Sequence, residues 1–235
     1  LRLQLPGRHG PRAAARQGQT PDLSAMIFWI TCIGGVAVAY LLGATPTGYL
    51  AGKMLRGIDI REHGSRSTGA TNVLRTLGKG PALVVLLVDV LKGVAAILFA
   101  RWLYPWLGVA VDGVAWAVCL CGLAVLLGHS RSLWLGFTGG KSAATGLGVL
   151  LALSWPVGLG AAAVFLLVLA VVRIVSLASM LAAVTAALLV CLLPEPLPYR
   201  LLVIAGGLYV IVLHRANIAR LLAGTEPKIG RRLAS

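Results

Sequence analysis

The sequence predicts an all-α polytopic membrane protein with about seven transmembrane helices, and three observations support this fold class. Hydrophobic residues make up 58% of the 235 residues and charged residues only 12%, whereas a soluble domain carries about twice that share of charge. Apolar runs long enough to cross a bilayer alternate with short polar loops. The net charge of +14, from 21 basic and 7 acidic residues, is concentrated in those loops. This pattern indicates anionic lipid headgroups, not nucleic acid, as the partner of the basic residues.

Seven apolar segments account for the predicted spans, since a membrane-spanning helix needs about 20 mostly apolar residues. The fourth and fifth segments are short and are joined by Ser154, Trp155 and Pro156, so they are either two closely connected spans or one broken hairpin. The prolines between 194 and 198 separate the last two segments. Five or six spans is the alternative count. The predicted spans are 26–45, 81–103, 109–128, 143–155, 158–172, 176–193 and 200–214.

The two chain ends differ from the domain between them. Residues 1–25 hold four arginines and three prolines, so we expect a disordered basic tail, with an over-extended reading frame as the alternative. A signal peptide is a further reading of this end. However, the apolar stretch from Met26 runs to Leu42 without a small-residue cleavage site, which favours a first span. We expect an integral membrane domain over 26–229 and a short basic tail over 230–235.

An odd number of spans places the two termini on opposite faces of the membrane. Fourteen of the 21 basic residues then share one face with the C-terminus. Because basic loops face the cytoplasm, the C-terminus is predicted inside and the N-terminus outside. The residues on the predicted cytoplasmic face are Lys53, Arg56, Arg61, Arg66, Arg75, Lys79, Arg131, Lys141, Arg173, Arg215, Arg220, Lys228, Arg231 and Arg232.

Two Gly-rich basic loops on that face predict a phosphate site at the membrane surface. Glycines let backbone N–H groups approach an anion, while Arg and Lys supply charge. The first loop, 63–79, places Ser65, Thr71 and Asn72 near Arg66 and Arg75. An ordinary loop with positive-inside charge is the alternative reading. It explains the cations but not the concentration of Gly, Ser, Thr and Asn.

The second loop, 129–148, contains Gly139, Gly140, Lys141 and Ser142, a run similar to the end of a nucleotide-binding P-loop. The first glycine of that motif is replaced by Leu135, and no strand precedes the run. We therefore reject a nucleoside triphosphatase. What remains is the simpler expectation that backbone N–H groups and one lysine hold a phosphate.

Charged and polar residues near the ends of the spans are further candidates. Asp89 and Lys92 stand three residues apart within the second span and are predicted to form a structural ion pair, because charges inside a membrane are costly. His129 ends the third span, and His214 and Asn217 share one helix face at the end of the last. Each histidine either acts in the reaction, as a base or as a hydrogen-bond donor to phosphate, or only caps the end of its helix.

No motif in the sequence indicates a catalytic nucleophile, a metal site or a cofactor site. The four cysteines all lie in apolar stretches and are expected to be small buried residues. We find no Ser-His-Asp order, no acid–base HxxxxD motif and no cysteine cluster. We therefore expect no metal and no cofactor, and a reaction that depends on positioning and charge stabilisation.

At these residues the chain resembles the bacterial acyl-phosphate:glycerol-3-phosphate acyltransferases, the PlsY family. The resemblance covers about 26–229. Its motifs are GSRSTGATNVLRTLGK in the first loop, VDVLKG in the second span, GHSRSLWLGFTGGKSAATGLG in the second loop, RIVSLAS, and HRANIARLLAGTEPK near the C-terminus. Arg66, Ser67 and Thr68 stand where many members have Gly-Asn-X, and the usual proline after Gly-His is absent.

The resemblance implies a reaction and a fold. A member of this family transfers a fatty acyl group from acyl phosphate to the 1-hydroxyl of glycerol 3-phosphate, giving lysophosphatidic acid and phosphate at the start of phospholipid synthesis. It also implies seven transmembrane helices in the bacterial plasma (inner) membrane, with the site facing the cytoplasm. Membrane lipids are then the surroundings, and an upstream enzyme that forms acyl phosphate is a candidate partner.

The chemistry of this reaction, with two phosphate-bearing substrates, suggests roles for the candidate residues. Ser65, Arg75 and Lys141 are expected to hold one phosphate. Ser179, His214 and Asn217 are expected to orient the glycerol hydroxyl, and the proton acceptor is His129, His214 or a substrate phosphate. The residues expected to bind phosphate through their backbone and loop positions are Gly69, Ala70, Thr71, Asn72, Gly139 and Gly140.

Two other classes of protein are alternatives to an acyltransferase. A transporter or channel for a phosphorylated solute needs charges along its path, and only Asp89 and Lys92 qualify. A phosphatidyl transferase needs paired carboxylates for Mg²⁺, and the sequence has no paired-Asp motif. The transporter is therefore kept as the alternative to the acyltransferase.

Overall fold

The computed structural model describes residues 23–109 and 111–230, and these residues form a helical bundle. Within them, extended structure is limited to one isolated bridge between Ser132 and Thr138. The predicted all-α class is confirmed. The helices are α1 (Leu23–Ala44), α2 (Thr47–Arg56), α3 (Ala70–Thr76), α4 (Lys79–Trp106), α5 (Val111–Ser130), α6 (Ala143–Leu153), α7 (Trp155–Val172), α8 (Val175–Leu192), α9 (Leu197–Leu213) and α10 (Arg215–Leu222), with 3-10 turns η1 (Ile60–Glu62) and η2 (Leu133–Leu135).

Each of the seven apolar segments corresponds to one helix, namely α1 and α4 to α9. In the described part of the chain, five helices are long and apolar enough to cross a membrane. A sixth is added if α9 and α10, which are bent by 58°, are taken as one span. Helix α6 has only 11 residues. The structure therefore supports a multi-pass membrane protein, and the count of seven spans stays a prediction.

Prolines lie at the starts of α7 and α9, whereas α7 ends just before Arg173, which has φ +61°. Helix α6 ends at Leu153 and α7 begins at Trp155, so Ser154 alone joins two separate helices. Pro156 lies in the first turn of α7, where a missing N–H costs no helical hydrogen bond. Pro198 has the same place in α9. The structure therefore shows two helices joined by one residue over 143–172, which fits both two closely connected spans and one broken hairpin.

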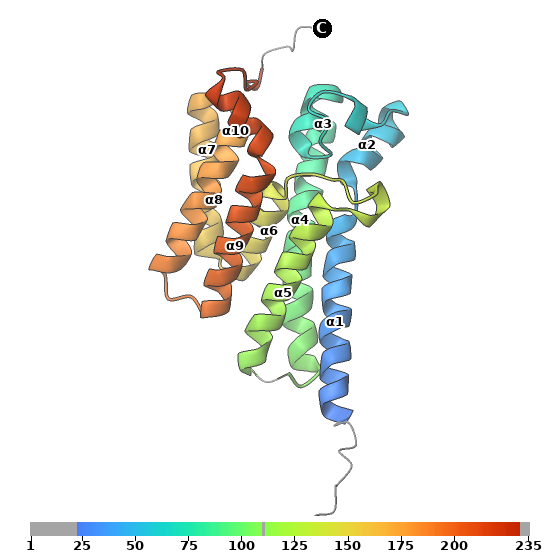
Figure 1. The fold of residues 1–235 in the computed structure, drawn as a ribbon, viewed down its shortest axis with the longest axis vertical. Helices are drawn as coiled ribbons and strands as arrows, with labels where there is room; N and C mark the ends of the chain where they lie inside the picture. The colour runs from blue at the N-terminus through green and yellow to red at the C-terminus, as the bar shows by residue number, and fades with distance from the viewer. Residues whose placement is uncertain (1–22, 110, 231–235) are drawn as a thin grey trace, which may run out of the picture.

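The bundle has two sides with α6 between them (Figure 1). Helices α1, α4 and α5 pack together on one side, α7, α8 and α9 form the other, and α6 contacts both α4 and α7. Two glycines allow the close approach of α4 and α6. A Cβ atom on Gly93 would lie 2.2 Å from the carbonyl oxygen of Thr145, and one on Gly148 would lie 2.0 Å from that of Val90. Small residues of this kind are typical of helix contacts within membranes.

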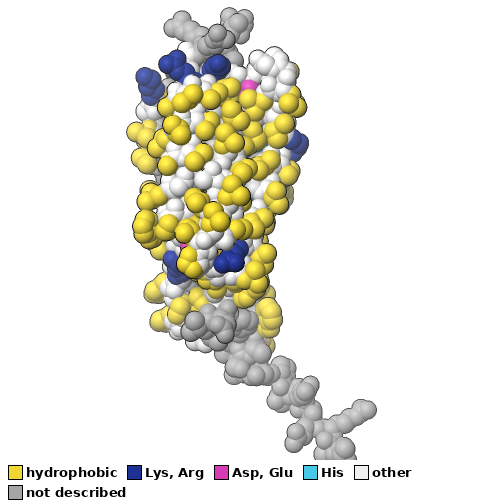
Figure 2. Space-filling model, turned by 90° about the vertical axis from the view of Figure 1, so that its left-hand side faces the viewer, with side chains coloured by type: hydrophobic (Ala, Val, Ile, Leu, Met, Phe, Trp, Pro, Cys, Tyr) yellow, Lys and Arg dark blue, Asp and Glu magenta, His cyan; other side chains and the backbone are white. Residues whose placement is uncertain are grey.

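The outer surface of the bundle suits a lipid environment. Figure 2 shows hydrophobic side chains covering the face on the side of α7 and α8, with Lys and Arg gathered towards its ends. Large apolar residues such as Leu167, Val171 and Leu188 are exposed there, and a water-soluble protein rarely exposes so much contiguous apolar surface. Residues 1–22 and 231–235, which contain most of the two predicted tails, lie outside the described residues.

Candidate active site

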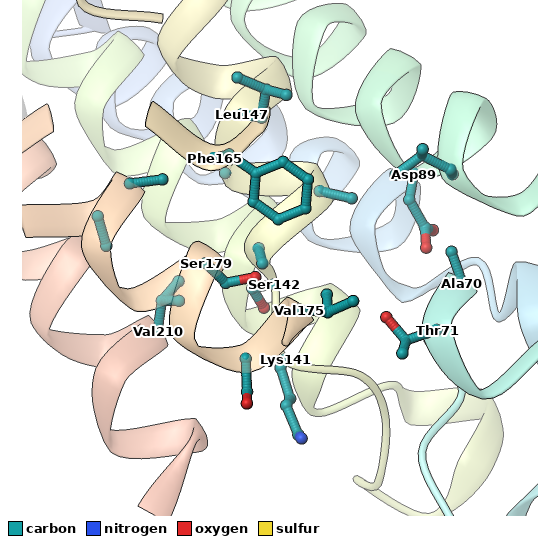
Figure 3. A pocket seen from close by; sticks show the side chains of 18 of the residues that line it. Ala70, Thr71, Asp89, Lys141, Ser142, Leu147, Phe165, Val175, Ser179 and Val210 are labelled. Atoms are coloured by element: carbon teal, nitrogen blue, oxygen red, sulfur yellow. The ribbon is translucent and has the colours of Figure 1, made fainter. Parts of the chain in front are cut away.

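A cavity of about 550 Å³ extends from the two Gly-rich loops into the bundle. Polar side chains line the end near the loops, and apolar residues of α4, α6, α7, α8 and α9 line the rest. Figure 3 shows Thr71 and Asp89 on one side, with Ser142, Val175 and Ser179 across from them. All six residues predicted to be catalytic line this one cavity: Ser65, Arg75, His129, Ser179, His214 and Asn217.

Lys141 is a partly buried cation at the polar end. It precedes α6, and the neighbouring Ser142, which has φ +57°, anchors the turn by donating from Oγ to the carbonyl oxygen of Leu126 at 2.7 Å. The Lys141 ammonium donates to Oδ1 of Asn217, so the second loop meets α10 here. Burial lowers the pKa of Lys141 to about 8, Glu226 opposes the shift, and Arg220 and Arg75 add to it.

Glu226 is a site residue that the sequence reasoning missed. It lines the cavity, and its carboxylate accepts hydrogen bonds from Ser176 at 2.7 Å, Asn217 at 2.6 Å and Arg220 at 2.7 Å. Burial acts against the charge, but these hydrogen bonds hold the pKa of Glu226 below its usual value. A lone carboxylate in the basic C-terminal motif was the available signal. Its partners, up to 50 residues away, were not visible in the sequence.

Arg75 is the second cation facing the cavity. It lies in the last turn of α3, and its guanidinium donates to the carbonyl oxygen of Pro227 at 3.4 Å. Burial lowers its pKa, and Glu226 raises it, but a guanidinium stays charged at every physiological pH. The first loop and the C-terminal segment therefore meet at this side chain, as the second loop and α10 meet at Lys141.

His214 has one nitrogen committed to the backbone. Its Nδ1 lies 2.8 Å from the carbonyl oxygen of Val210, which can only accept, so Nδ1 carries a proton. In the neutral ring Nε2 is then the nitrogen that can take up a proton. Since His214 also lines the cavity, it combines position and chemistry for a proton acceptor.

Asn72 organises the first loop rather than facing a ligand with its side chain. It is 1% exposed, and its Oδ1 accepts from the backbone N–H of Ser65 at 2.8 Å. Its backbone N–H is bonded to the carbonyl oxygen of Gly69. Gly69, Ala70, Thr71 and Asn72 all line the cavity. The Nδ2 atom of Asn72 lies 2.9–3.0 Å from three carbonyl oxygens, those of Ile60, His63 and Ser67.

Asp89 and Lys92 form an ion pair of 2.9 Å inside the bundle. The carboxylate also accepts from the hydroxyl of Thr47 at 2.7 Å and lies 3.5 Å from Nδ1 of His129. The Lys92 ammonium donates to the carbonyl oxygen of Thr45 at 3.2 Å. The pair thus joins α4 to α5 and to the start of α2, and Asp89 lines the cavity while Lys92 does not.

Gly139 and Gly140 do not line the cavity. A Cβ atom on Gly140 would lie 2.1 Å from Nε2 of His129, and one on Gly139 would lie 2.3 Å from the His129 carbonyl oxygen. That same carbonyl accepts the Gly140 N–H at 3.0 Å, so this donor is already used. The glycines let the second loop pack against His129, which differs from the phosphate contact expected of them.

Comparisons with known proteins identify the family of this chain. The family model described as glycerol-3-phosphate acyltransferase matches residues 33–224. Glycerol-3-phosphate acyltransferase 2 of Rhizobium johnstonii is 70% identical over 217 residues, covering 88% of this chain and 99% of that protein. The glycerol-3-phosphate acyltransferase of Nostoc sp. is 56% identical over 220 residues, covering 89% and 97%.

Two solved structures of PlsY, an integral membrane glycerol 3-phosphate acyltransferase, share the fold. The glycerol 3-phosphate form has a TM-score of 0.77 and 39% identity, with coverage of 85% of this chain and 96% of that one. The lysophosphatidic acid form has a TM-score of 0.75 and 38% identity, with coverage of 85% and 95%. The chain therefore belongs to the glycerol-3-phosphate acyltransferase family.

Proposed function

We propose that this enzyme transfers a fatty acyl group from acyl phosphate to the 1-hydroxyl of glycerol 3-phosphate, in phospholipid synthesis. Family membership makes the chain an acyltransferase that acylates glycerol 3-phosphate, and it decides against the transporter alternative. Acyl phosphate as the donor is the part that we add. The observation that carries the proposal is one cavity with a cationic polar end and a long apolar interior.

The polar end suits two phosphate groups. Lys141 and Arg75 both face it, and the hydroxyls of Ser65, Ser67 and Thr71 line it as further hydrogen-bond donors. Cations and hydroxyls together bind phosphate oxygens through charge-assisted hydrogen bonds. We assign Lys141, Arg75 and Ser65 to one phosphate, and the segment 69–71 to the other.

Acyl phosphate is a mixed anhydride, so the chemistry needs no protein nucleophile. The glycerol oxygen attacks the acyl carbon, a C–O ester bond forms, and the bond from that carbon to the phosphate oxygen breaks. The hydroxyl proton passes to Nε2 of His214 or to a phosphate oxygen of the substrate. Ser179 and Asn217, which line the cavity near His214, orient the hydroxyl. Holding both reactants in line, together with cations that stabilise the phosphate leaving group, lowers the barrier to such a step.

We also propose seven crossings, with α6 and α9 as spans and the cavity mouth on the cytoplasmic side of a bacterial inner membrane. Support comes from Figure 1, where α1 begins at one end of the bundle and α10 lies at the other, and from the basic residues that the loops at the α10 end carry. Labelling of a cysteine at Ser65 by a membrane-impermeant reagent from outside the cell would contradict this orientation.

The donor test decides the proposal. Purified protein, with EDTA present, is given glycerol 3-phosphate and one of three donors: acyl phosphate, acyl-CoA or acyl-carrier protein. We expect lysophosphatidic acid and inorganic phosphate in equal amounts with acyl phosphate, and no product with the other two. Product from acyl-CoA alone would refute the assignment of the donor, and a requirement for a divalent metal would refute the positioning mechanism.

A further inference from the structure

The apolar part of the cavity is open at its side and closed at its end. Its wall near the polar end includes Leu83 and Leu87 of α4 and Leu166 of α7, which are 56%, 52% and 62% exposed. These residues leave the groove open toward the surrounding lipid. Three lining residues farther in are buried instead, namely Ala161, Ala186 and Leu202, at 3%, 2% and 3% exposure.

Helix geometry places the buried residues far from the phosphate end. Ala186 comes ten residues after Ser176, whose hydroxyl bonds Glu226, which is about 15 Å along α8 at 1.5 Å per residue. Ala161 comes eight residues before Leu169 at the polar end of α7, which is about 12 Å along that helix. Figure 3 shows the intermediate level, where Leu147 and Phe165 lie beyond Ser179 and Lys141.

A packed layer lies directly beyond these alanines. Val157 is one helical turn past Ala161 on α7, and Val190 is one turn past Ala186 on α8; both are fully buried. With Leu153 at the end of α6 they belong to the same apolar core as the two alanines, and none of the three lines the cavity. The groove therefore stops at the level of the alanines.

We propose that Ala161 and Ala186 form the floor of the acyl groove and limit the length of the acyl chain that the enzyme accepts. This rests on the proposed function, in which the groove holds the acyl tail with its carbonyl at the polar end. A chain that enters through the open side and lies along the groove meets the floor with its terminal methyl group. Because both floor residues are alanines, their small side chains set the depth, and a larger residue at either position makes the groove shorter.

The test uses purified enzyme and a series of saturated acyl phosphates that differ by two carbons, with kcat/KM measured for each. Ala186→Leu and Ala161→Leu are expected to lower kcat/KM at least about tenfold for the longest donors that the wild type uses, and to change it less than about twofold for short donors. Ala163→Leu is the matched control, because Ala163 lies on α7 with Ala161 but is exposed and does not line the cavity. Its profile is expected to match the wild type.

A third variant makes the groove longer and does not add volume to the core. Leu150 of α6 lines the groove near its floor, and Leu150→Ala is expected to shift the preferred donor to a longer chain. If one leucine variant fails to fold, the other leucine variant and Leu150→Ala still test whether the floor limits the length of the acyl chain. Unchanged profiles in all folded variants, or an equal shift in Ala163→Leu, would overturn the proposal and indicate that the tail escapes sideways into lipid. Failure of the wild type with every acyl phosphate would instead refute the proposed function.

Discussion

The charged residues around the cavity fall into two groups that differ in how their charge is balanced. Inside the bundle, Asp89 and Lys92 are 1% and 6% exposed and neutralise one another, with Thr47 and His129 as further partners of the carboxylate. At the polar end, three cations, Lys141, Arg75 and Arg220, surround the single carboxylate of Glu226. Three positive charges against one negative charge leave two uncompensated.

This difference separates a structural charge from a ligand-binding one. A balanced buried pair fixes the helices that carry it and has no charge left for a ligand. An unbalanced group of partly buried cations is destabilising by itself, because its members repel and partial burial disfavours their charge, and an anion relieves both effects. The excess at the polar end therefore matches a phosphate ligand, whereas the pair in α4 matches a role in the fold.

The largest expected effect comes from breaking the balanced pair. Asp89→Asn leaves Lys92 buried without its counter-ion, which is expected to cost about 3–5 kcal/mol of stability, measured as a lower thermal unfolding temperature in detergent. The double variant Asp89→Asn with Lys92→Met is expected to recover most of that loss. Asp59→Asn, which breaks the partly exposed pair with Arg61, is the control and is expected to cost no more than about 1 kcal/mol. Equal losses of stability at the two sites would contradict a structural role that is specific to the buried pair.

The next effect concerns the unbalanced group. Lys141→Ala removes a charged donor from the proposed phosphate site, so a loss of about 1.5–3 kcal/mol of binding, roughly 10- to 150-fold in KM for glycerol 3-phosphate, is expected. Stability is expected to change little or to rise, because the repulsion among the cations falls. Lys53→Ala, at an exposed position of α2 outside the cavity, is the control. Unchanged steady-state kinetics in Lys141→Ala would remove this residue from the site.

The smallest effect is a pH dependence. The pKa of Lys141 is lowered to about 8, so the ammonium is charged below pH 8 and loses its proton as the pH rises through that value. KM for glycerol 3-phosphate is therefore expected to be lowest below pH 8 and to rise up to about tenfold by pH 9. In Lys141→Arg this rise is expected to disappear, because a guanidinium stays charged. The same rise in the arginine variant would assign it to another group.

Local patterns predicted most of the fold. Apolar run length, the polar break at Arg173 and the positions of Pro156 and Pro198 placed α6 through α9, because these signals act locally. The amphipathic helix α2 was not predicted, since it is short and follows α1 with a break of only two residues. Its role in the bundle depends on Thr47, which reaches Asp89 across 42 residues of sequence.

The sequence predicted many of the residues that line the cavity, but not the contacts that they make. Residue type and position on one membrane face gathered Ser65, Lys141 and His214, all of which line the cavity. Glu226 was missed because its function depends on partners from α8 and α10. Gly140 was assigned to phosphate because its motif is similar to a P-loop, but the tertiary contact with His129 decides its role.

The short helix α6 sets the depth at which the reaction occurs. It has 11 residues, while its antiparallel neighbour α7 has 18. At 1.5 Å per residue, the Lys141 end of α6 lies about 10 Å below the end of α7, and Figure 1 shows α6 recessed in this way. In a bilayer whose surface meets the end of α7, that level lies just inside the hydrocarbon edge, because the headgroup region of one leaflet is about 5–8 Å thick, and the ester linkages of glycerolipids lie close to this edge. A newly esterified glycerol is thus released at the level of its neighbours and needs only sideways diffusion to join the leaflet.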